Sequence, residues 1–259
     1  MHTTSDPPQG TGGHPADAAP PVLSVIVPAF DEAERLGASV TRILRHLDSR
    51  PYRSELILVL DGGRPGAAAA VEAVAGGRPD VRVLDNGVNR GKGYSVRRGM
   101  GASRGEYVLF ADADLSLPIE DTDRFLEVLR AGADAAIASR AHPESRVIGA
   151  PQRMRMSLGR VFNWIVQRAA LPGVADTQCG FKAFRGDLAR AIFPRQRSDR
   201  FGFDVEVLRL VRRRGGRIVE VPVTCEYREG SSVRRVRDGA SMLGDLAAIR
   251  WREWRGEYD

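Results

Sequence analysis

The sequence predicts an α/β fold, in which a mostly parallel sheet carries helices on both of its faces. Short β-branched apolar stretches alternate with longer stretches of helical apolar spacing over residues 22–140, and this alternation is typical of βαβ units. Of the 259 residues, 42% are hydrophobic and 28% are charged, a composition that is typical of a globular chain able to bury a sizeable core.

In the first half, the run at 22–30 reads as a buried strand, and 31–48 as a helix with Leu36, Val40 and Leu47 at helical spacing. We expect further strands at 54–63, 80–87, 106–114 and 133–140, and helices at 64–77, 93–105 and 118–132. In parallel sheets of this kind, ligands bind beyond the carboxyl ends of the strands.

The second half is less regular. Residues 154–171, 203–215 and 240–254 have the periodicity of amphipathic helices, 176–185 reads as a loop entering a strand, and 217–227 as a strand. Residues 1–21 are rich in Pro, Gly and Ala without apolar periodicity, so we expect a disordered tail before one domain at 22–259.

Composition restricts the compartment and the partners. No stretch approaches the length of a membrane span or has the layout of a signal peptide, and Cys179 and Cys225 read as reduced thiols, so we expect a cytoplasmic protein. The net charge of +6 comes mainly from arginine and suits phosphorylated molecules, anionic lipid or nucleic acid. The basic stretches lack the aromatic strips of nucleic-acid binders, so we expect no nucleic-acid partner.

Asp112 and Asp114 follow the apolar run that ends at Ala111. On an extended chain, residues two apart point the same way, and two converging carboxylates repel each other unless a cation lies between them. Mg²⁺ or Mn²⁺ bound by one or two carboxylates commonly takes its other ligands from water and phosphates. The pair therefore indicates a metal-diphosphate site, although the same residues also suit a turn and a helix cap before Pro118.

Other chemistries have less support. The four histidines are scattered, which disfavours a histidine metal site or a Ser-His-Asp triad. The stretch "NRGKGYSVRRGMG" resembles a phosphate loop without its full pattern, so Lys92 is a candidate phosphate ligand and the glycines beside it equally suit a tight turn.

The blocks "VIVPAFDEAERL", "LILVLDGG", "NRGKGYSVRRGM", "GEYVLFADADLS", "DTQCGFKAFR", "FGFDVEVL" and "VPVTCEYREGSSV" occur in this order. Together they resemble family 2 glycosyltransferases, most closely dolichyl-phosphate or polyprenyl-phosphate β-glucosyltransferases and next polyprenyl-phosphate mannose synthases. The resemblance covers about residues 22–250. It implies a GT-A fold, a nucleotide-diphospho sugar donor, Mg²⁺ or Mn²⁺, and inversion at the anomeric carbon.

The resemblance also implies roles for single residues. Residues 22–140 would form the donor half and 141–259 the acceptor half. Asp112 and Asp114 match the metal motif, Asp114 with a catalytic role, and the donor would also contact a set of residues from four blocks: Pro28, Ala29, Phe30, Glu32, Asp61, Lys92 and Ala113. Where the family has two acids and a serine, this chain has Leu60, Asp61 and Gly63, and Phe30 replaces its tyrosine, so base recognition can differ.

The acceptor side follows from the same resemblance. Arg140 and Gln178 would bind the acceptor, with Arg140 holding a phosphate bidentately. A lipid phosphate is already anionic and needs no general base, whereas a hydroxyl or amine acceptor would need one, for which Asp176 and Asp204 are the candidates. Asp204 equally suits the N-terminus of a helix.

We therefore expect a metal-dependent, inverting transferase that moves a hexose, with UDP-glucose as the expected donor, to a polyprenyl or dolichyl phosphate. The alternative is a soluble acceptor or a different sugar, such as mannose or N-acetylglucosamine. A sugar-nucleotide pyrophosphorylase would carry a Gly-rich segment after the first strand, which "VIVPAFDEAERL" lacks. Arginines beside Phe162, Trp164, Trp251 and Trp254 suggest peripheral contact with the inner face of a membrane, and a homo-oligomer is compatible with the sequence.

Overall fold

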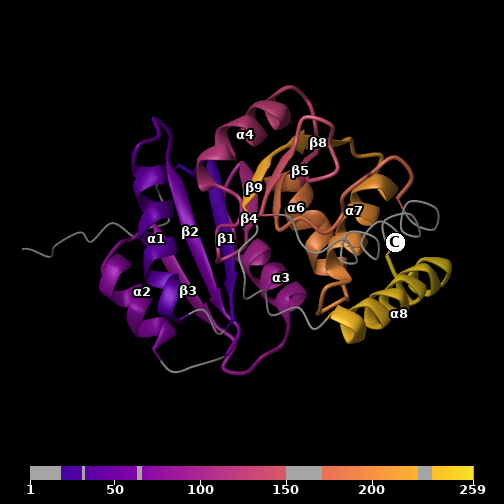
Figure 1. Ribbon diagram of the computed structural model, residues 1–259, viewed down its shortest axis with the longest axis horizontal. Coiled ribbons are helices and arrows are strands. Elements are labelled where there is room, and N and C mark those ends of the chain that lie inside the picture. The colour runs from indigo at the N-terminus through magenta and orange to yellow at the C-terminus, as the bar shows by residue number, and fades with distance from the viewer. Residues whose placement is uncertain (1–18, 31–32, 63–65, 150–170, 227–234, 259) are drawn as a thin grey trace, which may run out of the picture.

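A computed structural model describes residues 19–30, 33–62, 66–149, 171–226 and 235–258 (Figure 1). The order along the main sheet is β3-β2-β1-β4-β7-β5-β8. The strands of this sheet are β1 (Leu23–Ala29), β2 (Ser54–Leu60), β3 (Val81–Asp85), β4 (Tyr107–Ala111), β5 (Ala135–Ser139), β7 (Phe181–Arg185) and β8 (Ile218–Pro222). Only β7 pairs antiparallel with its neighbours among these strands, which confirms the expected mostly parallel sheet.

Helices cover both faces of the sheet, as expected from the sequence (Figure 1). One face packs against α1 (Ala33–Asp48), α2 (Ala67–Ala75) and α4 (Thr122–Arg130), the last preceded by a 3₁₀ turn at Ile119–Asp121. The other packs against α3 (Lys92–Ala102), α6 (Gly186–Ile192), α7 (Phe203–Arg213) and α8 (Arg235–Trp254), with a second 3₁₀ turn at Phe193–Arg195. Strand alternation separates the two cores, because Val25 and Val27 join the first while Ile26 joins the second.

The strand expected at 217–227 is instead two strands in two sheets. β8 ends at Pro222, and β9 (Thr224–Glu226) pairs with β6 (Arg146–Ile148) in a separate two-stranded sheet. The change of partner occurs at Val223, whose N–H donates to Ser145 Oγ at 2.9 Å and whose carbonyl accepts from Arg146 N at 2.9 Å. The prediction of one strand was therefore wrong, because apolar pattern alone does not fix which sheet a segment joins.

Two other expectations involve residues that are not all described. Residues 1–18 of the expected tail and nearly all of the helix expected at 154–171 lie outside the described residues. Pro21, at the expected end of the tail, is buried, and its carbonyl accepts from Glu106 N at 3.1 Å.

Helix α3 approaches the sheet closely at Gly99. A Cβ there would lie 2.3 Å from Ile26 Cγ2 and 3.2 Å from Val59 Cγ2, whereas a Cβ at Gly101, in the same helix, would meet nothing within 4 Å. This contact fixes the height of α3, and hence of Lys92 at its first position, above β1 and β2.

We predict that Gly99→Ala lowers the free energy of unfolding by ~1–3 kcal/mol, because the added methyl group overpacks the core. The matched change Gly101→Ala should instead raise it by roughly 0.5–1 kcal/mol through helix propensity. Urea titrations measure both values, and equal effects of the two substitutions would contradict this packing.

Candidate active site

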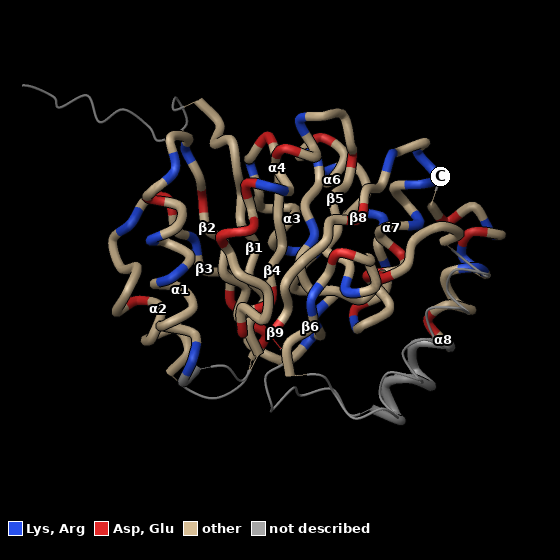
Figure 2. Tube along the Cα trace, turned by 45° about the horizontal axis from the view of Figure 1, so that its top comes forward, with Lys and Arg blue, Asp and Glu red and all other residues tan. Residues whose placement is uncertain are grey.

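Three parallel strands deliver polar residues to one edge of the sheet. Ala29 and Leu60, the last residues of β1 and β2, are register partners, and Asp61 N donates to the carbonyl of Ala29 at 2.9 Å. β4 runs parallel beside β1 and ends at Ala111, directly before Asp112. In Figure 2, acidic residues gather at this edge, below β4 and beside β9.

Asp112 and Asp114 lie in a turn that follows β4. Leu115 N donates to the carbonyl of Asp112 at 3.1 Å, and Leu115 has φ +48°, an uncommon conformation for a residue other than glycine. The expectation that the extended chain continues to Asp114 was therefore wrong. Asp114 Oδ1 accepts from Ser116 N at 2.9 Å, and the carboxylates of both Asp112 and Asp114 act on the charge of Lys92. The turn, rather than an extended strand, thus brings both carboxylates close enough to act on Lys92.

Gly180 makes room for the Asp112 carboxylate. The carbonyl of Gly180 accepts from Asp112 N at 3.0 Å, and a Cβ at Gly180 would lie 1.9 Å from Asp112 Oδ2. The "TQCGF" glycine therefore belongs to the site, a role that the sequence reasoning missed.

Lys92 Nζ lies 2.6 Å from Asp112 Oδ1. Its ammonium also lies 5.8 Å from the ring centroid of Phe110 and 5.9 Å from that of Phe203. Burial by itself would lower the pKa of Lys92, but the charges of Asp112, Asp204 and Asp114 outweigh it and raise that pKa. Lys92 is therefore a cation at neutral pH, at the position where the sequence predicts a phosphate ligand.

A second ion pair lies deeper. Lys182, opposite Phe110 in the β4–β7 register, donates to the Asp204 carboxylate and, at 2.6 Å, to the carbonyl of Cys179. Side-chain exposure is 1% for Lys182 and 2% for Asp204, and burial raises the pKa of Asp204 despite the two lysines nearby. Asp204 lies in the first turn of α7, whose N-cap residue is Gly202, and its carboxylate accepts from Lys182 in this buried pair. Sequence reasoning missed Lys182.

Asp61 organises the Gly-rich segment. Its Oδ1 accepts from Asn86 Nδ2 at 2.8 Å and Arg90 N at 2.9 Å, and its Oδ2 accepts from Gly91 N at 2.8 Å. Gly91 has φ +101°, and a Cβ there would lie 2.3 Å from the carbonyl oxygen of Asp199. Asp61 thus fixes the chain that presents Lys92, and its expected contact with a nucleotide base stays a prediction.

Arg140 and Asp176 form a two-point ion pair beyond β5. Arg140 Nε and Nη2 donate to the two Asp176 oxygens at 2.7 and 2.9 Å. The backbone N–H groups of Arg140 and Gln178 also donate to this carboxylate, and Glu220 on β8 accepts from Ala175 N and Asp176 N. Burial raises the pKa of Asp176, but these donors outweigh it and hold that pKa below its usual value. Asp176 is therefore a weak proton acceptor that orients Arg140.

Three residues that adjoin Arg140 or Asp176 in the sequence have polar atoms that are buried without a hydrogen-bond partner: Ser139 Oγ, Thr177 Oγ1 and Gln178 Nε2. Such groups are costly unless a ligand or water satisfies them.

The residues expected to contact the sugar donor from the first loop differ in exposure. Ala29 is buried, Pro28 is half-buried, and Phe30 is 43% exposed at the edge of the site, while Glu32 lies outside the described residues. Ala113, between the two aspartates, is buried.

The donor set suits a hard divalent ion that also takes ligands from its substrate. Asp112 and Asp114 supply two carboxylates, and no group of three or more His, Cys, Asp or Glu that could hold a metal occurs among the described residues. Mg²⁺ typically binds through one or two carboxylates plus phosphates and water. These residues fit Mg²⁺ or Mn²⁺ held together with a diphosphate.

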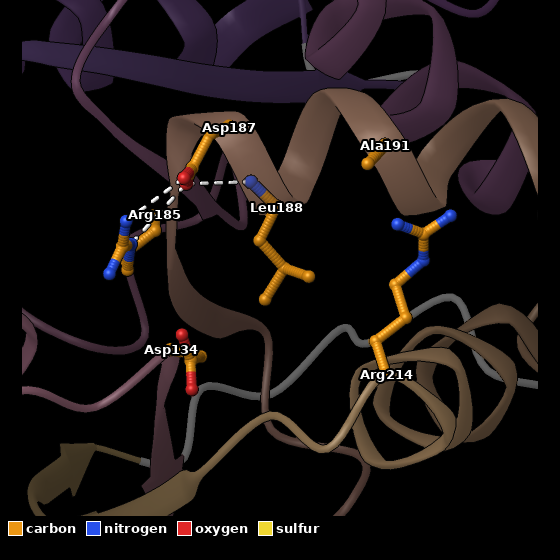
Figure 3. A pocket seen from close by; sticks show the side chains of 6 residues that line it. All are labelled: Asp134, Arg185, Asp187, Leu188, Ala191 and Arg214. Carbon is orange, nitrogen blue, oxygen red and sulfur yellow. Dashed lines mark hydrogen bonds and ion pairs between the residues drawn. The ribbon is translucent and has the colours of Figure 1, made fainter.

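A pocket of about 330 Å³ lies at the other end of the sheet (Figure 3). It is lined by Asp134, Arg185, Asp187, Leu188, Ala191 and Arg214. Arg185 is the register partner of Tyr107, the first residue of β4, whereas Asp112 follows its last. Because these two positions lie at opposite ends of β4, the pocket is separate from the candidate site. Within the pocket, the Arg185 and Asp187 side chains pair at 2.9 Å.

Comparisons with known proteins agree with this geometry. The model of "Glycosyl transferase family 2" matches residues 24–193. The chain is 33% identical over 242 residues to a dolichyl-phosphate beta-glucosyltransferase of Dictyostelium discoideum, covering 89% of this chain and 74% of that protein. It is 32% identical over 249 residues to the Homo sapiens protein with the same name, covering 91% and 77%.

Solved structures share the fold. The glucosyl-3-phosphoglycerate synthase of Mycobacterium tuberculosis in complex with Mn²⁺, UDP and glucosyl-3-phosphoglycerate has a TM-score of 0.64 at 18% identity, covering 95% of this chain and 86% of that one. The mannosyltransferase PcManGT of Pyrobaculum calidifontis in complex with GDP-Man and Mn²⁺ has a TM-score of 0.61 at 21% identity, covering 93% and 68%.

The fold is that of a GT-A glycosyltransferase, and the family match and the relatives agree with this class. The chain belongs to glycosyl transferase family 2, which confirms the resemblance seen in its sequence motifs. Among the described helices, none combines the length and the hydropathy that a bilayer-crossing segment requires.

We predict that Asp176→Asn lowers the free energy of unfolding at pH 7 by ~1–3 kcal/mol, less than a fully buried pair because the Arg140 side chain is 42% exposed. Because the pKa of Asp176 lies below its usual value of 3.8, its stabilisation is complete above that pH and is lost as the pH falls through the lowered pKa.

Urea titrations at pH 7 and pH 3 measure the difference in free energy of unfolding between Asp176→Asn and the unmodified protein. This difference should be smaller at pH 3 than at pH 7. Asp187→Asn, in an exposed pair with Arg185, is the control and should cost under about 1 kcal/mol. A difference between Asp176→Asn and the unmodified protein that grows toward pH 3 would contradict the ion pair.

Proposed function

We propose that this protein transfers glucose from UDP-glucose to a polyprenyl or dolichyl phosphate, with inversion at the anomeric carbon and with Mg²⁺ or Mn²⁺. The observation that carries the proposal is the convergence of Asp112, Asp114 and Lys92 beyond the ends of β1, β2 and β4. Relatives named as dolichyl-phosphate beta-glucosyltransferases support the sugar and the acceptor. The neighbour solved with Mn²⁺ and UDP supports the metal and the nucleotide.

On the donor side, Asp112 and Asp114 would hold the divalent ion. When bound, this ion offsets the charge that builds on the departing diphosphate. Lys92 would add a positive charge within reach of the same phosphates. Pro28, Ala29, Phe30, Glu32 and Ala113 would contact the nucleotide, while Asp61 holds the segment that leads to Lys92.

On the acceptor side, Arg140 presents a guanidinium that Asp176 holds in place, with part of its surface exposed. Gln178, two residues after Asp176, has an Nε2 group that is buried without a partner, and this group can hydrogen-bond to a phosphate oxygen. A phosphate oxygen is already anionic, so attack on the anomeric carbon removes no proton. Asp204 is buried and paired with Lys182, and both oxygens of Asp176 accept from Arg140, so both are poor general bases, which favours a phosphate over a hydroxyl acceptor.

We predict that Asp112→Ala and Asp114→Ala each lower the transfer rate by at least about a hundredfold, because each removes a carboxylate from the diphosphate site. The assay follows radiolabelled glucose from UDP-glucose into lipid extracted after incubation with polyprenyl phosphate and Mg²⁺ or Mn²⁺. Asp80→Ala, at the opposite end of β3, is the matched control and should keep its activity.

A panel of other nucleotide sugars and soluble acceptors runs in parallel. Transfer only from another donor, or only into a soluble product, would contradict the proposed substrates. Full activity of Asp114→Ala would contradict the metal site.

We also propose that the protein contacts an anionic membrane through the end of α8. Trp251 and Trp254 are 57% and 77% exposed, and their ring centroids lie 5.2 Å apart. The exposed side chains of Arg250 and Arg255 flank them. Paired aromatic rings with nearby arginines suit the interface of an anionic bilayer, where the lipid acceptor would be found.

We predict that a double change of Trp251→Ser and Trp254→Ser reduces flotation with vesicles that contain anionic lipid by roughly tenfold, since two large apolar side chains no longer insert. Val88→Ser, at a 61% exposed apolar residue elsewhere, is the control and should float normally. Equal flotation of all three proteins would contradict this contact.

A further inference from the structure

Lys92 and Lys182 are the only lysines in the sequence, although Lys and Arg together number 39. Both ammonium groups lie beside the same ring, at 5.8 and 5.1 Å from the centroid of Phe110. An ammonium is a compact point charge on a flexible stem, whereas a guanidinium is a rigid planar fork. All remaining Lys or Arg positions are arginine, so the two compact cations of this chain lie together in one cluster.

The two lysines differ in how firmly they are held. Lys182 is 1% exposed and donates both to the Asp204 carboxylate and to the Cys179 carbonyl. Lys92 is 21% exposed and pairs with Asp112, itself 34% exposed, at the rim of the site. Lys182 is thus a fixed part of the interior, while the Lys92–Asp112 pair lies within reach of a ligand.

We infer that Lys92 is a built-in counter-cation for Asp112 that exchanges this carboxylate for the incoming diphosphate, so that divalent-cation binding and diphosphate binding are coupled. The inference rests on the proposed function for the identity of the donor. It adds to that function a reason why the metal and the nucleotide would bind together.

The electrostatics require a counter-charge before the donor arrives. The carboxylates of Asp112, Asp114 and Asp204 all act on Lys92, and without its ammonium the carboxylates at the rim would repel one another. A divalent cation and the ammonium would both be drawn to Asp112 and would repel each other there. A metal ion alone must therefore compete with Lys92.

A diphosphate changes this competition, because it offers Lys92 another anion. The side chain can swing on its four-carbon stem, while Gly91, fixed by Asp61, keeps the backbone of α3 in place. The affinity for the metal then rises when the diphosphate binds, and the affinity for the diphosphate rises equally when the metal binds.

The test measures free Mn²⁺ by electron paramagnetic resonance in titrations of the full chain, with and without UDP. In the unmodified protein, UDP should raise the Mn²⁺ affinity by roughly tenfold or more, within the range common for coupled sites. In Lys92→Met, Mn²⁺ alone should bind roughly tenfold more tightly, and the enhancement by UDP should fall by a similar factor.

Arg90→Met is the matched control. It removes one positive charge two positions away, from an exposed side chain that stacks on Tyr94 at 4.9 Å, and should behave as the unmodified protein. Lys92→Met with Mn²⁺ affinity and UDP enhancement within twofold of the unmodified values would overturn the inference. The arm without nucleotide does not depend on the sugar donor, so failed transfer from UDP-glucose contradicts the proposed function alone.

A second measurement follows the unmodified protein, and a variant serves only to assign its signals. With ¹³C-labelled lysine, the protein gives side-chain ε-carbon signals from two residues only, and Lys92→Arg assigns them by removing one. Addition of Mg²⁺ and UDP should shift the Lys92 signal and leave that of Lys182 in place. Equal shifts of both signals, or a shift of Lys182 alone, would overturn the exchange.

Discussion

The charge of Asp112, set at the end of a buried strand, is the constraint on which the candidate site depends. It is balanced by Lys92 at 2.6 Å, and this single pair joins the Gly-rich segment before α3 to the turn after β4. The packing around this pair keeps its two side chains in position. Gly99 sets the height of α3, Asp61 fixes the segment that precedes it, and Gly180 leaves the space that the Asp112 carboxylate fills.

The antiparallel strand β7 explains how distant parts of the chain reach this pair. It enters the sheet between β4 and β5, so that Gly180 lies against Asp112 and Lys182 lies opposite Phe110. The loop before β7 also carries Asp176, which holds Arg140 at the end of β5. One inserted strand therefore connects the residues proposed for the donor with those proposed for the acceptor.

The sequence was enough to predict the parallel sheet, because β1, β2 and β4 are continuous apolar runs whose helices follow at once. It also placed Asp61, Asp112 and Asp114 beyond the ends of predicted strands, and it made Lys92 a candidate phosphate ligand without placing it at that edge. It could not place β7, because a five-residue strand carries no signal of its neighbours or direction. Lys182 was missed for the same reason: a lysine in a strand reads as exposed until its partner Asp204 is known.

We infer that Asp112 exchanges Lys92 for a divalent cation when the donor binds. A crystal structure with UDP and Mn²⁺, with anomalous scattering recorded for manganese, tests this exchange. It should show a manganese peak within coordination distance of Asp112 and Asp114, with Lys92 Nζ moved from Asp112 to a phosphate oxygen. Bound UDP and manganese with Lys92 still paired to Asp112 would contradict it.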